Sequence, residues 1–376
     1  MDITLIYGGK SGEHEISLVS AAAVARNIKK EHNITLIAIT KTGRWFLQEK
    51  SELERIQNDS NASFKISEDE KNEVFIVPGG GTKRALFANS KHIPTDVVFP
   101  VLHGTFGEDG TIQGLLEMAE LPYVGCPTLA SAITMDKEKS KSALAQLGIP
   151  VVPGLCMRKS DIADWKRYDE ILDEAQKKLG FPMFVKPCSA GSSDGANLAK
   201  NLQQLNGAIM EAFCWDNKIL IEKAIDAREI ECSVTGNPTT FDGKNDFEKL
   251  TAYGPGEISP THQFYDYDAK YKDPNGAELL IPANLPEERL EEVRTLAKKA
   301  FKALDLAGLS RVDFFIDRKT DMLYLNEINT MPGFTQISMF PKMCEKFGLD
   351  FPNLTELLLK QAVERFKSAR KLKTSR

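Results

Sequence analysis

The first third of the chain alternates short apolar runs with helical stripes. Residues 3–7, 34–39 and 97–102 are apolar runs that predict buried strands. A helix is expected after the first and after the last of these strands, because apolar residues recur there at helical spacing. The two stripes are Ile16, Val19, Ala23 and Ile28, and Ile112, Leu115, Leu116 and Ala119. Strands that alternate with helices predict a parallel, doubly wound α/β sheet.

Polar and turn-forming residues interrupt this pattern twice. Residues 50–95 are largely polar and contain Pro78 followed by three glycines, which predicts an insertion with a short hairpin. Prolines and glycines also cluster between residues 122 and 154. We therefore expect a boundary between two segments near residues 127–150.

The second half of the chain has a mixed α+β pattern. Short apolar runs predict strands at residues 184–186, 219–222, 229–234, 311–316 and 323–329. Helical stripes predict helices near residues 203–214, from about 286 to 304, and from about 354 onward. The buried side of the long helix would consist of Leu290, Val293, Ala297, Ala300 and Leu304.

Composition narrows the possible functions. The chain has 376 residues, 42% hydrophobic and 27% charged, which excludes disordered and collagen-like proteins. A net charge of −5 offers no basic field for nucleic acid, and the basic last sixteen residues fit a solvated chain end. No apolar run approaches the roughly 18 residues that span a bilayer, and the first residues do not resemble a signal peptide. The six cysteines lack a C-x-x-C pair and fit buried thiols in a reducing compartment. We expect a cytoplasmic protein that binds neither nucleic acid nor membrane.

The expected hairpin over residues 311–329 brings charged side chains face to face. Side chains alternate along a strand, so Arg311 and Asp313 share a face, as do Glu327 and Asn329. Closing the turn with residue 317 opposite 323 puts Asp313 opposite Glu327 and Arg311 opposite Asn329. A divalent cation held by these carboxylates and the Asn329 amide oxygen would remove their repulsion. The alternative is a solvated hairpin without a metal.

Three loops could bind ligands. Residues 186–195, rich in glycine and serine, follow a strand and offer N–H groups and hydroxyls to phosphate, although the P-loop spacing is absent. A plain surface turn is the alternative there. Residues 8–15 and 103–110 follow strands of the parallel sheet, where such folds bind ligands. Glu13 could capture a substrate ammonium, or it could complement the dipole of the first helix.

Motifs along nearly the whole chain resemble those of D-alanine–D-alanine ligases of the ATP-grasp superfamily. They are residues 8–17, 103–110, 135–137, 186–195, 221–223, 264–271, 311–313 and 326–335. The resemblance implies an ATP-grasp fold with an N-terminal doubly wound α/β domain at residues 1–127, on the substrate side. A central domain at 128–225 and a C-terminal domain at 226–376, with the metal and catalytic residues, would hold ATP between them.

The resemblance also implies a role for each matched residue. Asp313, Glu327 and Asn329 would hold two Mg²⁺ or Mn²⁺ ions. ATP would be bound by Lys137, Lys186, Ser193, Glu222, Glu229 and Lys270, with both Lys137 and Lys186 on its phosphates, Glu222 on adenine and Glu229 on the ribose. Glu13, with His103 nearby, would take the ammonium of the first D-alanine, and Ser338 and Met339 would line the pocket of the second.

The remaining implied roles concern the reaction itself. Arg311 and the N–H of Gly333 would face the oxygen that becomes anionic. Tyr271 lies on a loop that would close over the site and link to Ser192 and Glu13. The glycine loop departs from the family pattern at Ser189, Ala190 and Asp194, which leaves its contacts open.

The implied activity is the ATP-dependent joining of two D-alanines through an acylphosphate, for peptidoglycan precursors, by an enzyme that the family suggests is a homodimer. One alternative is a ligase of the same fold for another D-amino acid or a D-lactate acceptor; Tyr271 argues against the ester. The other is a nucleotide-binding regulator that has lost turnover. The intact set of Arg311, Asp313, Glu327 and Asn329 counts against a regulator.

Overall fold

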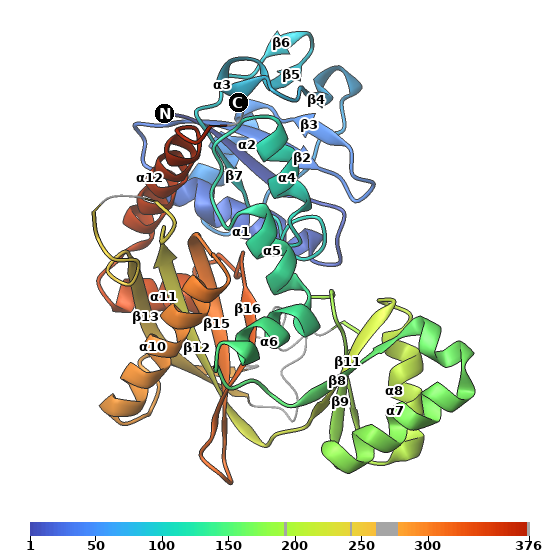
Figure 1. Cartoon of the computed structure of the whole chain (residues 1–376). Coiled ribbons are helices and arrows are strands. Elements are labelled where there is room, and N and C mark those ends of the chain that lie inside the picture. The colour runs from blue at the N-terminus through green and yellow to red at the C-terminus, as the bar shows by residue number, and fades with distance from the viewer. Residues whose placement is uncertain (192–193, 241–242, 261–276, 374–376) are drawn as a thin grey trace.

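The computed structural model describes residues 1–191, 194–240, 243–260 and 277–373. Three bodies are visible in Figure 1: an N-terminal one at the top, a central one at the lower right and a C-terminal one at the lower left. Ser192, Ser193, Lys270 and Tyr271 lie outside the described residues. Within the described ranges, no helix is long and apolar enough to cross a membrane.

The N-terminal body is built on a mainly parallel sheet. Its strands lie in the order β3 (Trp45–Leu47), β2 (Asn33–Ile39), β1 (Asp2–Gly8) and β7 (Val97–Pro100). β1 pairs in parallel with both β2 and β7, while the edge strand β3 is antiparallel. Helices α1 (His14–Asn27) and α4 (Thr111–Met118) follow β1 and β7, as the pattern predicts. The doubly wound parallel sheet is confirmed.

Two positions of the predicted helical stripes are wrong. Val19 on α1 is 44% exposed and Leu115 on α4 is 37% exposed. The other three positions of the α1 stripe, Ile16, Ala23 and Ile28, are buried as predicted, and every residue from Ser20 to Ala25 is buried as well. This part of α1 is enclosed on more than one side, because α12 (Phe351–Ala369) packs against it in addition to the sheet. Burial by a distant helix is not visible in the local spacing.

The polar insertion is more ordered than its composition predicts. It contains α2 (Lys50–Asn58), the 3-10 turn η1 (Glu70–Asn72), α3 (Gly81–Arg84) and a small antiparallel sheet. The strands of this sheet are β4 (Val74–Ile76), β5 (Leu86–Ala88) and β6 (Lys91–His92). β5 and β6 form the expected short hairpin, turning at Asn89 and Ser90 with φ of 50° and 57°. Positive φ at both turn residues is the geometry that tight hairpins prefer.

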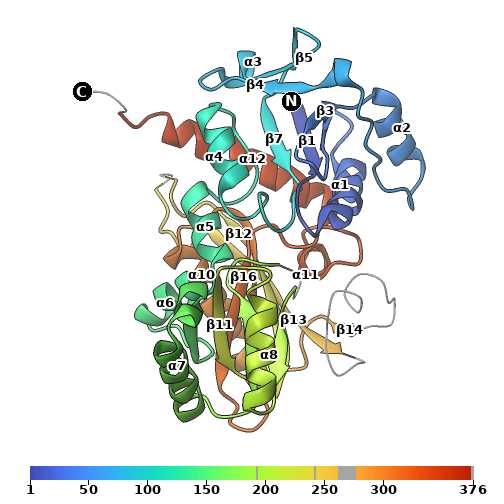
Figure 2. The same ribbon diagram turned by 90° about the vertical axis from the view of Figure 1, so that its right-hand side faces the viewer.

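The central body is an antiparallel sheet with helices on one face. The strands lie in the order β10 (Asn197–Ala199), β9 (Met183–Pro187), β11 (Lys218–Lys223) and β8 (Gly154–Arg158). The 3-10 turn η2 (Lys159–Ala163) and the helices α7 (Trp165–Lys178) and α8 (Leu202–Ala212) complete the body. Residues of both helices share one apolar core with the sheet. Figure 2 shows these helices in front of the sheet.

The C-terminal body holds the larger antiparallel sheet. Its order is β14 (Ala277–Leu280), β13 (Leu250–Pro260), β12 (Ala227–Gly236), β15 (Gly308–Asp317) and β16 (Leu323–Asn329). The long helix α10 (Glu287–Ala303) packs on β12 and β13, and its predicted inward residues are all buried. The short helix α11 (Met339–Lys346), which the pattern did not predict, also contacts these strands.

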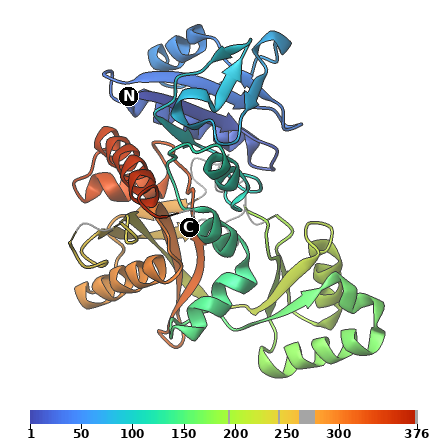
Figure 3. The same ribbon diagram turned by 45° about the horizontal axis from the view of Figure 1, so that its top comes forward.

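Two connections join the bodies. Helices α5 (Thr128–Met135) and α6 (Lys137–Gln146) contribute Ala130 and Leu144 to the core beneath the C-terminal sheet. They therefore pack on the C-terminal body, although chain order puts them with the central segment. At the other end, α12 contributes Leu354 and Leu358 to the core of the N-terminal sheet. In Figure 3, α5 and α6 run between the two lower bodies.

Candidate active site

The hairpin of β15 and β16 brings the predicted metal and oxyanion residues together. Arg311 pairs with Asn329 and Asp313 with Glu327, as predicted. The turn-side register differs, because Ile316, not Asp317, lies opposite Leu323. A bulge between Asp313 and Phe314 absorbs the difference of one residue. Local alternation could not reveal this extra residue.

Charges on this face of the hairpin are closely matched. Two nitrogens of Arg311 donate to the two carboxylate oxygens of Asp313 at 2.7 and 2.8 Å, and Nε also lies 3.1 Å from a carboxylate oxygen of Glu231. The Asn329 side chain donates to Asp313 at 2.9 Å. On the opposite face, Val312 and Phe314 are buried. The apolar face thus fixes the strand while the polar face points into the site.

The donor set of the hairpin fits a hard divalent cation. Asp313 and Glu327 offer carboxylate oxygens at directly facing positions. The Asn329 amide, which now donates to Asp313, could present its oxygen instead after a half-turn, because its O and NH₂ are similar in size. No thiol or imidazole belongs to this set. Lys137 approaches Glu327, with 4.0 Å between Nζ and the nearer carboxylate oxygen.

A buried charge cluster lies on the central sheet. Glu222 on β11 is 1% exposed, and its two oxygens accept hydrogen bonds from Lys141 and from Lys186, the latter at 2.8 Å. Burial alone would raise the pKa of Glu222, but the two lysines outweigh it and lower this pKa to about 2. For Lys186, burial lowers the pKa but Glu222 raises it above the ordinary value. Glu222 and Lys186 are therefore charged at neutral pH. For Lys141, burial lowers the pKa, and the contact with Glu222 opposes this shift.

The first turn of α6 anchors the glycine loop. The backbone N–H of Lys137 donates to the carbonyl of Cys188 at 3.0 Å, and its ammonium donates to the carbonyl of Ala190 at 2.8 Å. Asp136 caps the helix by accepting from the N–H of Lys139 at 3.1 Å. The predicted Lys137 and the start of the loop are thus adjacent.

Glu13 lies where loops of the N-terminal and central bodies meet. A Cβ added to Gly104 or to Gly191 would lie 2.6 or 2.5 Å from a Glu13 carboxylate oxygen, so a side chain at either position would require the Glu13 carboxylate to move; Gly104 also has a φ of 72°. Glu13 is 8% exposed. Asp194 is also near, because burial and then the charge of Glu13 raise its pKa. The departure from the family pattern at Asp194 therefore adds a second carboxyl group near Glu13.

Two groups of the 103–110 loop tie the N-terminal body to the chain after β16. His103 Nδ1 lies 2.9 Å from the carbonyl of Met331, and Nε2 lies 2.9 Å from the Ser20 hydroxyl. Burial lowers the pKa of His103, which fits a neutral ring donating from Nδ1. Glu108, which sequence reasoning did not single out, accepts from the N–H groups of Gly104 and Met331 at 2.9 Å each.

The other predicted residues lie on the C-terminal body. Gly333 lies against Ser338, whose Oγ would be 2.9 Å from a Cβ at that glycine. Ser338 also accepts from the Thr335 N–H at 3.1 Å. Met339 is 5% exposed and belongs to the core shared with the N-terminal sheet. Glu229 lies on β12 opposite Phe315, and its charge acts on Lys186.

Family profiles match both halves of the chain. The profile described as D-ala D-ala ligase N-terminus matches residues 2–126, and that described as D-ala D-ala ligase C-terminus matches residues 143–360. The chain belongs to the D-alanine–D-alanine ligase family.

Relatives of this ligase family match along the full length. A protein from Treponema denticola named D-alanine–D-alanine ligase is 54% identical over 376 residues, covering all of both chains. A relative of the same name from a Thermoanaerobacter species is 45% identical, with 96% of each chain covered. The chain is therefore an ADP-forming ligase, and the family implies ATP and D-alanine as substrates.

Solved structures give the same result for the fold. The D-alanine-D-alanine ligase from Coxiella burnetii superposes with a TM-score of 0.81 at 33% identity, covering 99% of this chain and 96% of that one. The VanG D-Ala:D-Ser ligase from Enterococcus faecalis gives 0.80 at 34% identity, covering 96% and 99%. The expected ATP-grasp fold is thereby confirmed.

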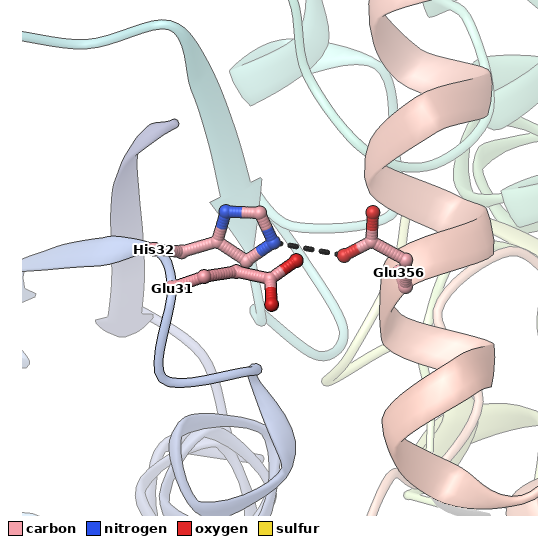
Figure 4. A group of neighbouring side chains, drawn as sticks. All are labelled: Glu31, His32 and Glu356. Carbon is pink, nitrogen blue, oxygen red and sulfur yellow. Dashed lines mark hydrogen bonds and ion pairs between the residues drawn. The ribbon is translucent and has the colours of Figure 1, made fainter.

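One further cluster of polar side chains lies away from the candidate active site. Across the described ranges, Glu31, His32 and Glu356 form the one group of three possible metal ligands whose ligand atoms all lie within 4.8 Å of one another (Figure 4). The amino group of Met1 lies 3.2 Å from His32 Nδ1, and Glu356 lies 2.8 Å from Nε2. An ammonium can only donate, so Nε2 carries the ring proton and bonds to Glu356. Lys360 also pairs with Glu356, at 3.2 Å. These contacts connect α12 to the N-terminal body.

Proposed function

We propose that this chain joins two D-alanines into D-alanyl-D-alanine through an acylphosphate, with ATP converted to ADP and phosphate, for peptidoglycan precursor synthesis. The observation that carries the proposal is the facing pair Asp313 and Glu327 beside Arg311, across from the lysines on Glu222. This arrangement suits transfer of a phosphoryl group and stabilisation of developing negative charge.

The nucleotide would lie between the central and C-terminal bodies. Lys137 and Lys186 would contact the phosphates, with Glu222 toward adenine and Glu229 toward the ribose. Ser193 and Lys270 are further nucleotide ligands in this proposal. Asp313, Glu327 and Asn329 would hold two Mg²⁺ or Mn²⁺ ions, which supply charge neutralisation during phosphoryl transfer. Their oxygen donors support the assignment.

The amino acids would lie toward the N-terminal body. Glu13 would hold the ammonium of the first D-alanine, with the neutral His103 beside it. Phosphorylation of the first carboxylate creates a leaving group that the amine of the second D-alanine can displace. Ser338 and Met339 would line the second subsite. The burial of Met339 supports a role in shaping this wall more than direct contact.

Two donors would stabilise the tetrahedral oxyanion. The guanidinium of Arg311 and the N–H of Gly333 come from the end of the hairpin and the segment after it. Donors aimed at a developing oxyanion contribute about 3 to 4 kcal/mol each in comparable sites. Because an acylphosphate hydrolyses, water must be excluded, and Tyr271, linked to Ser192 and Glu13, would hold the closing loop.

Product analysis tests the proposal. The enzyme is supplied with ATP, Mg²⁺ and D-alanine alone, and then with equimolar D-serine or D-lactate added. We expect ADP and D-alanyl-D-alanine in the first case and mostly dipeptide of D-alanine in the second. The mixed acceptors matter because a structural neighbour is a D-Ala:D-Ser ligase. Mostly ester or D-serine product would reassign the second substrate.

The same assay separates the remaining alternative. A nucleotide-binding regulator would bind ATP without forming ADP when D-alanine is present. The domain limits of 1–127, 128–225 and 226–376, the homodimer and the cytoplasmic location are parts of the same proposal. Light scattering of the purified chain tests the dimer, and it is independent of the assay.

A further inference from the structure

Lys141 is a buried lysine that none of the roles above includes. It lies on α6 one helical turn after Lys137, so both side chains project from the same side of the helix. The residue is 7% exposed, and its ammonium donates to one carboxylate oxygen of Glu222. Lys186 donates to the other oxygen at 2.8 Å. Two ammonium groups therefore share one carboxylate in the interior.

The contact between Lys141 and Glu222 joins two bodies. Leu144, the next residue of α6 to be fully buried, belongs to the core of the C-terminal body. Glu222 belongs to β11 of the central sheet, and Lys186 lies on the neighbouring strand β9. The proposed nucleotide lies between these bodies. Lys141 is thus in place to act on it through Glu222.

The charges of this cluster explain why two lysines are needed. When the phosphates of ATP attract Lys186, Glu222 loses one of its cations. A buried carboxylate without a cation is strongly destabilised. Lys141 keeps Glu222 compensated, so Lys186 is free to bind the phosphates.

We propose that Lys141 is a positioning residue of the nucleotide site, which holds Glu222 ionised and in place and so releases Lys186 to ATP. The inference rests on the proposed function, because it takes ATP as the ligand. Lys141 touches no substrate in this account and acts only through Glu222.

The test measures binding apart from turnover. Calorimetry with ATP and Mg²⁺ is compared for the unaltered enzyme, Lys141→Met, Lys141→Arg and Lys139→Met. We expect Lys141→Met to raise the Kd for ATP at least 10-fold and the KM for ATP with it, while kcat and the KM for D-alanine stay within about 3-fold. Lys141→Arg keeps the charge and should recover most of the affinity. Lys139 has a side chain that is 58% exposed on the same helix, so Lys139→Met is the matched control and should bind ATP normally.

A second background distinguishes this route from a direct contact. Once Glu222→Gln has removed the carboxylate charge, Lys141 has nothing to compensate. Adding Lys141→Met to Glu222→Gln should then change the Kd for ATP less than 3-fold. An equal loss in both backgrounds, or normal ATP binding by Lys141→Met, would overturn the inference.

Two outcomes need separate interpretation. If the unaltered enzyme does not bind ATP, the proposed function fails; if it binds ATP and Lys141→Met binds equally well, only the inference about Lys141 fails. If circular dichroism shows that Lys141→Met does not fold, the comparison of Glu222→Gln with the double variant decides. Equal ATP affinity of those two supports the inference, and a further 10-fold loss contradicts it.

Discussion

Two enclosed carboxyl groups of this molecule have opposite electrostatic environments. Glu222, on the proposed nucleotide side, has two lysines on its oxygens and a pKa of about 2. Glu108, on the amino-acid side, accepts from two backbone N–H groups. Burial and then the charge of Glu13 raise the pKa of Glu108 to about 8. The same chemical group is therefore fully ionised in one wall of the site and largely protonated in the other.

In the proposed function, this difference would favour different ligands at the two walls. The nucleotide side collects Lys137, Lys141 and Lys186, and their positive charge suits phosphates. In the proposed arrangement the amino-acid side collects the carboxyl groups of Glu13, Glu108 and Asp194. The charge of Glu13 raises the pKa of the other two, and a substrate ammonium beside Glu13 would relieve this repulsion. Opposite charges on the two walls thus favour one orientation for each ligand.

The largest expected effect comes from the hairpin on the nucleotide side. Glu327→Gln keeps the shape of the side chain but removes a charge that we assign to cation binding. Turnover with Mg²⁺ should fall about 1000-fold or more, equivalent to about 4 kcal/mol, while thermal unfolding changes little. Glu345→Gln, an exposed position on α11, serves as the control. Near-normal steady-state activity of Glu327→Gln would contradict the proposed metal site on this hairpin.

The next effect concerns Arg311, between the two walls. Arg311→Lys keeps the charge but loses the planar fork that now holds Asp313 at 2.7 and 2.8 Å. We expect kcat to fall about 100-fold, or about 3 kcal/mol, because the developing oxyanion exists only in the transition state. Arg318→Lys in the adjoining turn should behave normally. A change confined to the KM for ATP would instead make Arg311 a nucleotide ligand.

The features that could be predicted from the sequence are those set by residues within one hairpin. Alternation along β15 and β16 places Arg311 with Asp313, and Glu327 with Asn329, on one face. The pairing of Asp313 with Glu327 came out as predicted because the bulge offsets the turn register, which differs by one residue. The bulge beside Phe314 adds one residue without disturbing the alternation near Arg311, so it leaves no signal in the pattern.

Features that depend on distant segments could not be predicted. Lys141 looks like a surface lysine until α6 packs between two sheets and brings it to Glu222. Val19 belongs to the apolar stripe of α1 but is exposed, whereas α12 and the sheet together bury the helix from Ser20 to Ala25. In each case the deciding contact lies far away along the chain.

A smaller effect tests the amino-acid side through its pH dependence. The raised pKa means that Glu108 binds its proton more tightly in the folded state than in the unfolded chain. Its stabilising contribution is therefore complete below the ordinary pKa of about 4.3 and is lost as the pH rises to about 8. The Glu108→Gln variant cannot ionise at this position, so its stability should not fall with rising pH for this reason.

Urea unfolding between pH 5 and pH 9 measures the difference. Relative to the unaltered chain, Glu108→Gln should gain about 2 kcal/mol over this range, less than the full pKa shift implies, because coupling to Glu13 spreads the titration. Glu345→Gln provides the reference profile. A difference that does not vary with pH would show that Glu108 ionises normally and would break the contrast with Glu222.

The smallest effect is expected at Glu356, a carboxylate with a cationic partner outside the site. Its hydrogen bond from His32, then that from Lys360, hold its pKa below the ordinary value, and Met1 and Glu31 are the other charged groups nearby. Because the pKa is lowered, the contribution to stability is present above about pH 4.3 and is lost as the pH falls further. Glu356→Gln should therefore destabilise the fold by no more than about 1 kcal/mol at pH 7, since Lys360, one of its two partners, is largely exposed. The difference in unfolding free energy should shrink as the pH falls below about 4.3, whereas Lys367→Gln on the same helix should show no such trend. A loss of several kcal/mol at pH 7 would mean that this link between α12 and the N-terminal body resembles the buried Glu222 cluster more than a surface pair.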